Sequence, residues 1–369
     1  MIYRPKGNNV ENLWKKNFID IEPYVAGEQP KSDDIIKLNA NENPYPPSPA
    51  VMKAIEQFGA EGLRMYPSMD AAPLRQAVAE RCGALNGVSL SRENVFIGNG
   101  SDDVLATAFR AFFNSDKPIL FPDVTYSFYP VWCELLKIPY LTKPVDERFE
   151  INASDYAEPN GGVVIPNPNA PTSIGRGLDF VREILELNRD CIVIIDEAYV
   201  DFGGESAIPL LSEYGNLLVT QTFSKSRSMA GMRIGMAFGS PELITMLDAV
   251  KDSYNSYPMD KLAIVTGIAS VNDEDYFRET LAKVISTRDR TAAAMRGMGF
   301  DVAESSTNFL FAQHEKLGAK EIFTFLRERG IYVRYWNKPR INNRLRITVG
   351  TDEQMDKMLA ALKELTAEP

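Results

Sequence analysis

The stretch Cys191-Ile-Val-Ile-Ile-Asp-Glu-Ala-Tyr199 is a continuous apolar run that ends in two carboxylates, an alanine and a tyrosine. Such a run is typical of a fully buried strand in a parallel sheet. In open α/β sheets, ligands bind at the carboxyl ends of the strands, so we expect Asp196 and Tyr199 at the edge of a site. The alternative is that Asp196 only caps the chain that follows.

A second segment, Thr222-Phe-Ser-Lys-Ser-Arg-Ser-Met-Ala-Gly-Met-Arg-Ile-Gly235, follows an expected strand over residues 216–220. A lysine amine is inert while it is protonated, so a lysine that forms a Schiff base needs surroundings that disfavour its charge. Lys225 lies among hydroxyl groups, and those of Thr222 and Ser224, together with Arg233, suit a nearby phosphate anion. A lone Ser-Lys-Ser tripeptide is more often a solvated basic loop, so this interpretation depends on the rest of the chain.

A third segment, Val95-Phe-Ile-Gly-Asn-Gly-Ser-Asp-Asp103, predicts a short strand that leads through two glycines into a helix over residues 102–113. A strand, a glycine turn and a helix N-terminus together form an anion site from free backbone N–H groups and the helix dipole. The pattern is neither G-x-G-x-x-G nor a Walker loop, because no Gly-Lys-Ser/Thr follows. Asp102 and Asp103 also fit the commoner role of acids in the first turn of a helix.

Composition narrows the class of protein. The chain has 369 residues, 44% of them hydrophobic, which is enough for two domains with a sizeable core. Its net charge of −10 argues against binding to nucleic acid or to an anionic membrane surface, since either partner calls for a basic patch. Residues 1–16 lack the apolar segment of a signal peptide, and no run is long enough to span a bilayer.

The cysteines and the single histidine limit the chemistry. Cys82, Cys133 and Cys191 are widely spaced and form no C-x-x-C pair, which fits a reducing compartment; we expect a cytoplasmic protein. His314 is the only histidine, so a histidine-based triad or a multi-histidine metal site is excluded, and no metal is expected. His314 follows an expected strand over residues 308–312 and is predicted to lie on the surface. Proton transfer therefore falls to another group, and Lys225 is the leading candidate.

Helical and strand patterns alternate from about residue 49 to residue 239, as expected for a doubly wound α/β domain. The pattern predicts helices over 72–85 and 179–187 and strands over 118–121 and 162–165. Later segments predict a smaller α+β domain, with helices over 273–298, 319–329 and 352–365 and strands over 300–303, 308–312, 331–335 and 344–349. We expect an N-terminal arm over residues 1–48 that joins the small domain, a large domain over 49–257, and a small C-terminal domain over 258–369.

Eight motifs occur in order along nearly the whole chain: Leu38-Asn-Ala-Asn-Glu-Asn-Pro44, Met65-Tyr-Pro67, Gly98-Asn-Gly-Ser-Asp102, Val124-Thr-Tyr126, Asn167-Pro-Asn-Ala-Pro-Thr172, Asp196-Glu-Ala-Tyr199, the Lys225 segment and Arg344-Leu-Arg-Ile-Thr-Val-Gly350. Together they resemble the fold-type I aminotransferases of class I and II, which depend on pyridoxal 5′-phosphate (PLP). They are most similar to the histidinol-phosphate aminotransferase branch. The resemblance implies a mostly parallel large-domain sheet, a smaller α+β domain and a homodimer.

The resemblance also implies a role for each matching residue. Lys225 would bind the cofactor covalently and carry the proton from the substrate α-carbon. Asp196 would pair with the pyridine nitrogen, where a fixed negative charge keeps the ring protonated. Tyr199 would contact the ring oxygen O3′, and Tyr126 would stack on the ring. The phosphate would be held by the backbone at Ser101 and Asp102, by Thr222, Ser224 and Arg233, and by Tyr66 of the partner subunit.

One departure from the family pattern concerns an amide near O3′. The family usually has asparagine directly before Pro-Thr-Gly, whereas here Ala170 precedes Pro171 and Ser173 replaces the glycine. Asn169, one position earlier, is our candidate to supply the amide through a shifted turn; otherwise that contact is missing.

The implied reaction is transamination of histidinol phosphate with 2-oxoglutarate to imidazole acetol phosphate and glutamate, a step of histidine biosynthesis. Arg346 would clamp the substrate carboxylate with its planar fork, and Tyr24, Tyr66 and Arg334 would receive the distal end. A structural salt bridge is the rival role for Arg334. Nearby aromatic residues keep an aromatic amino acid aminotransferase open, and a PLP-dependent decarboxylase of a phosphorylated amino acid would use the same Lys225. A non-catalytic sensory module is disfavoured because Lys225 and Asp196 are intact.

Overall fold

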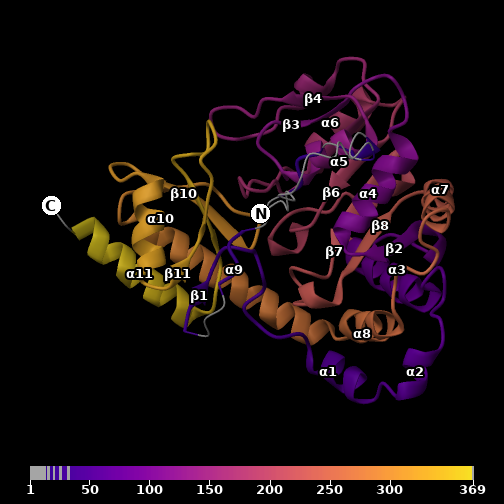
Figure 1. Ribbon diagram of the computed structural model, residues 1–369, viewed down its shortest axis with the longest axis horizontal. Coiled ribbons are helices and arrows are strands. Elements are labelled where there is room, and N and C mark those ends of the chain that lie inside the picture. Colours follow the sequence, from indigo (N-terminus) through magenta and orange to yellow (C-terminus); the bar gives the residue numbers. More distant parts are fainter. Residues whose placement is uncertain (1–13, 15–16, 20, 25–26, 31–33, 368–369) are drawn as a thin grey trace.

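The computed structural model describes residues 14, 17–19, 21–24, 27–30 and 34–367. Within these residues the largest unit is a seven-stranded sheet, the large sheet, with strand order β2-β8-β7-β6-β5-β3-β4 (Figure 1). Its strands are β2 (Val95–Asn99), β3 (Ile119–Pro122), β4 (Tyr140–Lys143), β5 (Gly162–Pro166), β6 (Val193–Asp196), β7 (Leu217–Thr222) and β8 (Ile234–Phe238). Neighbouring strands are parallel except at β8, which is antiparallel to β2 and β7. The predicted mostly parallel sheet is confirmed.

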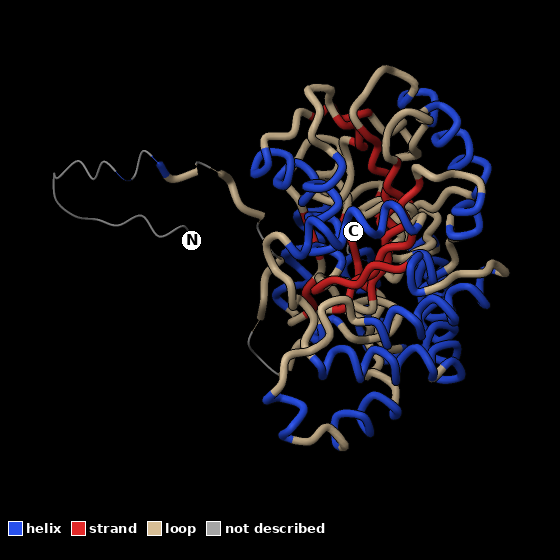
Figure 2. Tube along the Cα trace, turned by 90° about the vertical axis from the view of Figure 1, so that its right-hand side faces the viewer, coloured by secondary structure: helices blue, strands red, loops and turns tan. Residues whose placement is uncertain are grey.

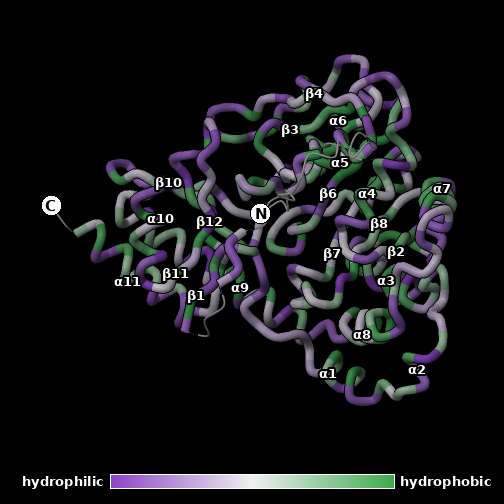
Figure 3. Tube along the Cα trace, in the orientation of Figure 1, coloured by the Kyte–Doolittle hydropathy of each residue, from purple (hydrophilic) through white to green (hydrophobic). Residues whose placement is uncertain are grey.

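Helices pack on both faces of the large sheet, which is why its central strands are buried along their whole length. Every residue of β5, β6 and β7 is buried. Separate hydrophobic clusters fill the two faces, and Figure 3 shows hydrophobic stretches in surrounding helices such as α4 and α8. The helices of this part are α1 (Pro49–Glu56), α2 (Ala60–Arg64), α3 (Ala72–Asn86), α4 (Ser101–Phe112), α5 (Phe128–Leu136), α6 (Leu178–Leu187), α7 (Pro241–Asp252) and α8 (Lys261–Asn272).

Local signals in the sequence explain where several of these helices begin and end. The side chains of Ser48 and Ser240 accept hydrogen bonds from backbone N–H groups in the first turns of α1 and α7. Each serine is followed by a proline, which fits the first helical position. Gly87 ends α3 in a left-handed conformation, with φ of 66°. Short 3₁₀ helices cover Arg92–Asn94, Ala153–Tyr156, Val200–Phe202, Ile208–Ser212 and Ala230–Met232.

The C-terminal part of the described chain forms a four-stranded antiparallel sheet, the small sheet, with order β12-β13-β10-β9. Its strands are β9 (Phe300–Val302), β10 (Phe309–His314), β12 (Arg334–Tyr335) and β13 (Leu345–Thr348). The helices α9 (Glu274–Arg296), α10 (Ala319–Glu328) and α11 (Asp352–Ala367) accompany it at the left of Figure 1. Strand β1 (Ile36–Lys37) pairs in parallel with β11 (Ile331–Tyr332).

Two predictions for this part are wrong. The single strand predicted over residues 331–335 is split at Val333, because β11 pairs with β1 whereas β12 joins the small sheet. His314 is buried, not on the surface. Its Nδ1 accepts hydrogen bonds from the backbone N–H groups of Lys316 and Leu317, at 3.2 and 3.0 Å. The imidazole thus provides an acceptor for two N–H groups of the turn after β10.

The topology brings several strand ends to one edge of the large sheet. Because β2 and β7 are each antiparallel to β8, they run in the same direction as β5 and β6. The carboxyl ends of β2, β5, β6 and β7 therefore lie beside the amino end of β8, where ligands bind in open α/β sheets. Figure 2 shows the strands passing through the interior with helices outside them.

The limits of the two domains and of the arm stay a prediction. Much of the arm expected over residues 1–48, and residues 368–369 of the expected small domain, lie outside the described residues. No helix in the described part of the chain is long and apolar enough to cross a membrane.

Candidate active site

A cavity of about 220 Å³, the inner cavity, lies at the edge of the large sheet where the strand ends meet. It adjoins an outer cavity of about 370 Å³ that reaches the small sheet. The two cavities share Ala40, Tyr126, Ala170, Tyr199 and Lys225. Predicted site residues lie on both sides: Ser101, Asp102, Asp196, Ser224 and Arg233 line the inner cavity, and Tyr24, Arg334 and Arg346 line the outer one. Lys225 therefore lies where the two cavities meet.

Lys225 follows β7 in a loop that is anchored at several points. Its Nζ lies 5.7 Å from the centre of the Tyr199 ring. Asn43 Nδ2 donates hydrogen bonds to the carbonyl oxygens of Lys225 and Ser226, at 3.0 and 3.2 Å. The backbone N–H of Met229 donates to the carbonyl of Phe223 at 3.1 Å, which closes the loop. The lysine side chain thus projects from a fixed backbone.

Asp196 ends β6 and is buried at the bottom of the inner cavity. Burial raises the pKa of its carboxyl to about 6, because a charge is poorly solvated there. Hydrogen bonds from Tyr129 Oη at 2.7 Å and Thr220 Oγ1 at 3.3 Å act against this rise. A cationic ring nitrogen in the inner cavity would supply the opposite charge that this carboxylate lacks, so Asp196 fits the pyridinium of the expected cofactor.

The turn between β2 and α4 forms an anion cradle with the start of β8. A Cβ at Gly100 would lie 2.2 Å from Arg233 Nη2, and one at Gly235 would lie 2.3 Å from the carbonyl carbon of Gly100. Glycine is needed at 235 because a Cβ there would collide with backbone atoms, and it is favoured at 100 because φ is 86°. The guanidinium of Arg233 therefore lies against the N-terminus of α4, where Ser101 begins the helix. These are the donors that a phosphate requires.

The two predicted hydroxyls have different places at this cradle. Ser224 lines the inner cavity, whereas Thr222 does not. The Thr222 hydroxyl lies 3.0 Å from Ser224 Oγ and accepts a hydrogen bond from the Ser224 N–H at 3.1 Å. Thr222 thus orients Ser224 from behind. Asp102 lies 3.6 Å from Arg233 and accepts a hydrogen bond of 2.8 Å from Tyr126 Oη.

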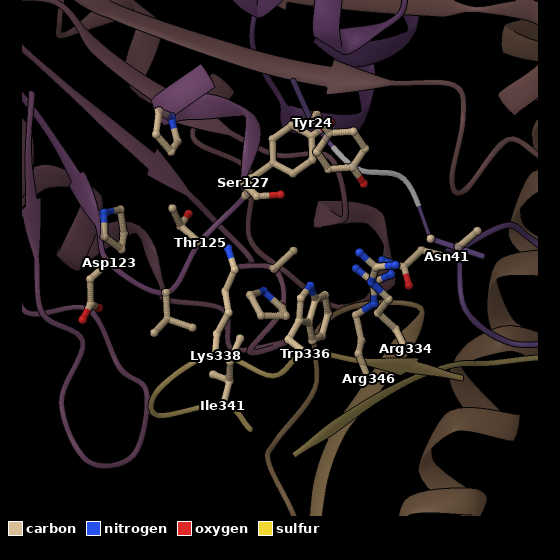
Figure 4. A pocket seen from close by; sticks show the side chains of 18 of the residues that line it. Tyr24, Asn41, Asp123, Thr125, Ser127, Arg334, Trp336, Lys338, Ile341 and Arg346 are labelled. Carbon is tan, nitrogen blue, oxygen red and sulfur yellow. The ribbon is translucent and has the colours of Figure 1, made fainter. Parts of the chain in front are cut away.

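Arg346 and Arg334 form the cationic end of the outer cavity. Their guanidinium carbons lie 5.2 and 5.3 Å from the Trp336 ring centre, and Figure 4 shows these three side chains grouped together, with Lys338 beyond the indole. Arg346 Nη2 donates to the carbonyl of Asn39 at 2.9 Å, and its Nε is buried without a partner in the described residues. Burial lowers the pKa of Arg346. A buried cation with an unused donor is suited to an anionic ligand.

The structure does not bring all the predicted residues into the cavities. Asn169 lines neither cavity: its Nδ2 donates to the carbonyl of Val124 at 2.9 Å, and its Oδ1 accepts from Thr125 at 3.3 Å. Tyr66 also lies outside them; it is 79% exposed and stacks on Tyr257 with ring centres 4.7 Å apart. Tyr24 lines the outer cavity and stacks on Phe128 at 4.4 Å.

Sequence reasoning missed several side chains of this site. Asn41 donates a hydrogen bond to Tyr199 Oη, Tyr129 donates to Asp196, and Lys338 lines the outer cavity. The motif over residues 38–44 was a signal for Asn41, although it gave no role. Nothing in the local sequence distinguishes Tyr129 from the apolar residues around it, because its partner is 67 positions away.

Comparisons with known proteins agree with this geometry. Residues 33–362 match the family model of aminotransferase class I and II. The histidinol-phosphate aminotransferases of Lactococcus lactis subsp. cremoris (strain SK11) and Acinetobacter baumannii (strain SDF) are each 51% identical to the chain. Each alignment covers 95% of this chain and 97% of the relative.

Solved structures show the same fold. The histidinol-phosphate aminotransferase of Sinorhizobium meliloti, in complex with pyridoxal-5′-phosphate, matches with a TM-score of 0.80 and 25% identity over 90% of both chains. A mutant aspartate aminotransferase of Thermus thermophilus matches with a TM-score of 0.78 and 19% identity, over 92% of this chain and 100% of that one.

Proposed function

We propose, because this chain belongs to the class I and II aminotransferase family, that it catalyses the PLP-dependent transamination of histidinol phosphate with 2-oxoglutarate. The products are imidazole acetol phosphate and glutamate, so the chain acts in histidine biosynthesis. The observation that carries this function is the place of Lys225, between an anion cradle with a buried acid and a cavity with two arginines. Relatives that are 51% identical over nearly their full length carry the same assignment.

The residues of the inner cavity fit the cofactor. When bound, PLP supplies an aldehyde that condenses with amines and a ring that accepts the electron pair released at the substrate carbon. We propose that Arg233, Ser224 and the N-terminus of α4 hold its phosphate. Asp196 would hold its ring nitrogen as a cation, and Tyr199 would donate a hydrogen bond to its ring oxygen. Tyr126 would pack against the ring.

We assign the proton transfer to Lys225. Its Nζ takes the proton from the amine-bearing carbon of the donor and would return it to the carbon of the cofactor that receives the amino group. The anchored loop holds the backbone from which this side chain extends. The amine must be uncharged to accept this proton. Lys225 lines both cavities, so its side chain lies where they meet.

The two arginines of the outer cavity bind the anionic groups of both substrates in turn. Histidinol phosphate has no carboxylate; a phosphate ester occupies the position that the α-carboxylate has in glutamate and 2-oxoglutarate. Arg346 and Arg334, with Tyr24, therefore have to accept either a carboxylate or a phosphate. Two adjacent guanidinium groups suit this task because each can form two parallel hydrogen bonds to planar oxygen pairs or to a phosphate.

We also propose a homodimer in which Tyr66 reaches the cofactor phosphate of the partner subunit. Leu63, Met65 and Tyr66, at the end of α2 and after it, are 74, 55 and 79% exposed. Large apolar side chains gathered on one surface are typical of a protein–protein contact. For localisation we propose the cytoplasm, since the three cysteines of the chain are free thiols.

A single-turnover experiment tests the proposed reaction. The PLP-loaded protein is mixed separately with L-histidinol phosphate and with L-phenylalanine, and the visible absorption of the lysine-bound cofactor is followed. We expect histidinol phosphate alone to discharge this absorption rapidly, and 2-oxoglutarate to restore it. Discharge mainly by phenylalanine would instead identify an aromatic aminotransferase, and absence of the visible band would overturn the assignment of Lys225.

A further inference from the structure

Asn41 is a buried residue that the small sheet holds against the large one. Its N–H donates to Thr348 Oγ1 at 2.9 Å, and its Oδ1 accepts from the same hydroxyl at 3.1 Å. Asn308 Nδ2 donates to its carbonyl at 3.0 Å. Thr348 ends β13 and Asn308 precedes β10, so the small sheet fixes both the backbone and the amide oxygen of Asn41.

The remaining group of the amide, Nδ2, donates a hydrogen bond of 2.8 Å to Tyr199 Oη. A phenol oxygen that accepts from an amide keeps its own O–H free to donate elsewhere. Tyr199 lines both cavities, and Lys225 lines them beside it. The contact with Asn41 therefore orients the Tyr199 hydroxyl as a donor toward the site.

Asn169 and Ala170, where the family usually has an amide close to the cofactor, supply no second amide to Tyr199. Ala170 packs its methyl group in the same apolar cluster as Tyr199. The amide of Asn169 is engaged with Val124 and Thr125. Among the residues that the structure describes, Asn41 is thus the side chain that hydrogen-bonds Tyr199 Oη.

We propose that Asn41 is a positioning residue, which acts through Tyr199 to set how tightly Lys225 Nζ holds its proton in the cofactor-loaded enzyme. This inference rests on the proposed function. A hydrogen bond received from Asn41 polarises the Tyr199 hydroxyl and makes it a stronger donor. A stronger donor would draw negative charge away from the cofactor's ring oxygen. Because that negative charge would stabilise the proton on Nζ, drawing it away weakens the hold of Nζ on its proton. Asn41 therefore favours release of that proton.

The backbone of Asn41 decides which substitution is informative. Its φ is 55°, in the left-handed region that asparagine and glycine tolerate better than other residues. Asn41→Gly consequently removes the amide and keeps the turn. Tyr199→Phe removes the hydroxyl through which Asn41 is proposed to act, and the double variant combines the two changes.

The test is a pH titration of the visible absorption of the PLP-loaded protein, which reports the protonation of Lys225 Nζ and does not require turnover. One hydrogen bond corresponds to about half a pH unit to one pH unit, so we expect Asn41→Gly to raise the midpoint by that amount. Tyr199→Phe should raise it at least as far. In the Tyr199→Phe background, Asn41→Gly should produce no further change.

Asn188→Ala is the matched control. Asn188 is also a buried asparagine, but it lines neither cavity and its Nδ2 donates to the carbonyl of Ile184 at 2.8 Å, so the midpoint should stay at the wild-type value. If Asn41→Gly does not fold, as judged by thermal unfolding of the cofactor-free protein, Asn41→Asp is titrated in its place, because aspartate also tolerates a positive φ and its carboxylate has no N–H to donate to Tyr199.

The inference is overturned if Asn41→Gly leaves the midpoint unchanged. It is also overturned if Asn41→Gly shifts the midpoint of the Tyr199→Phe protein by as much as it shifts that of the wild type. Either result would leave the proposed function intact, because the wild-type protein would still show the visible band. Absence of that band in the wild-type protein would instead reject the proposed function.

Discussion

The hydroxyl of Tyr129 donates a hydrogen bond of 2.7 Å to Asp196 Oδ2, and both side chains are buried. Tyr129 lies in the first turn of α5, so this helix reaches under the end of β6 to hold the carboxylate. Thr220 of β7 approaches the other oxygen at 3.3 Å. The acid is thus fixed in place by neutral donors, and none of the ion pairs among the described residues includes it.

The first prediction concerns Asp196→Asn in the cofactor-free protein. The carboxyl has a higher pKa in the folded chain, about 6, than the 3.8 of the unfolded chain, so the folded state binds this proton more tightly. The free energy of unfolding therefore falls as the pH rises from about 4 to about 6. The Asp196→Asn variant has no ionisable group at this position, so its free energy of unfolding does not fall for this reason. We expect it to be more stable than the wild type at pH 8 by up to about 3 kcal/mol.

Urea unfolding of both cofactor-free proteins at pH 4 and pH 8 measures this difference. At pH 4 the two should have similar stability, because the carboxyl is then largely protonated. The variant should also bind PLP more weakly, since the ring nitrogen loses its counter-charge. An asparagine variant that is less stable than the wild type at pH 8 would contradict the role of burial.

The second prediction concerns Lys225→Ala. The variant should fold and bind PLP, but sodium borohydride should no longer attach the cofactor to the chain, as measured by protein mass. Turnover should fall by at least about 10³-fold, because both the covalent link and the proton carrier are lost. Lys320→Ala, on the exposed face of α10, should keep normal turnover and normal attachment. Near-normal transamination by Lys225→Ala would refute the assignment.

The third prediction compares two glycines. At Gly100 an added methyl group would meet Arg233 Nη2 at 2.2 Å, whereas at Gly87 nothing lies within 4 Å. Both residues have positive φ, 86° and 66°, so alanine strains the backbone at each. Gly100→Ala should raise the dissociation constant for PLP by about 10- to 100-fold, the value of a hydrogen bond to a charged group. Gly87→Ala should lower stability but leave this constant unchanged. Equal PLP affinity in the two variants would remove Arg233 from the phosphate site.

The fourth prediction concerns Arg346→Ala. This buried cation is expected to bind the phosphate of histidinol phosphate and the carboxylate of 2-oxoglutarate, so kcat/KM should fall by about 10²-fold for both. Arg344→Ala is the control from the same strand region. Arg344 pairs with Asp301 at 2.7 Å, so its loss should affect stability and not KM. A fall for only one substrate would show that the two anions bind at different places.

The parts of the fold that depend on apolar runs could be predicted from the sequence. The run before Asp196 predicted a buried strand with a carboxylate at its end, and β6 ends at that residue. The glycines before Ser101 predicted a strand, a turn and a helix, which are β2 and α4. In these segments the sequence pattern agrees with the structure, because the same sheet determines which residues are buried and where each strand ends.

Contacts between distant segments could not be predicted in this way. Asn41 and Tyr199 are 158 positions apart, and their contact depends on how the small sheet meets the large one. His314 is polar, so its position was predicted to be exposed; burial is tolerated because its ring satisfies two backbone N–H groups. The strand over residues 331–335 was predicted as one unit, because an alternating pattern does not reveal a change of partner.

The division of that strand at Val333 links β1 to the small sheet. β11, on one side of Val333, pairs with β1, and β12, on the other side, carries Arg334. Leu38 adds to this link: its N–H donates to the carbonyl of Tyr332 at 2.7 Å, and its carbonyl accepts from the N–H of Thr348 at 2.9 Å. The segment that holds Asn41 is therefore attached to the small sheet. The placement of this one sheet consequently sets both the substrate arginines and the Asn41–Tyr199 contact.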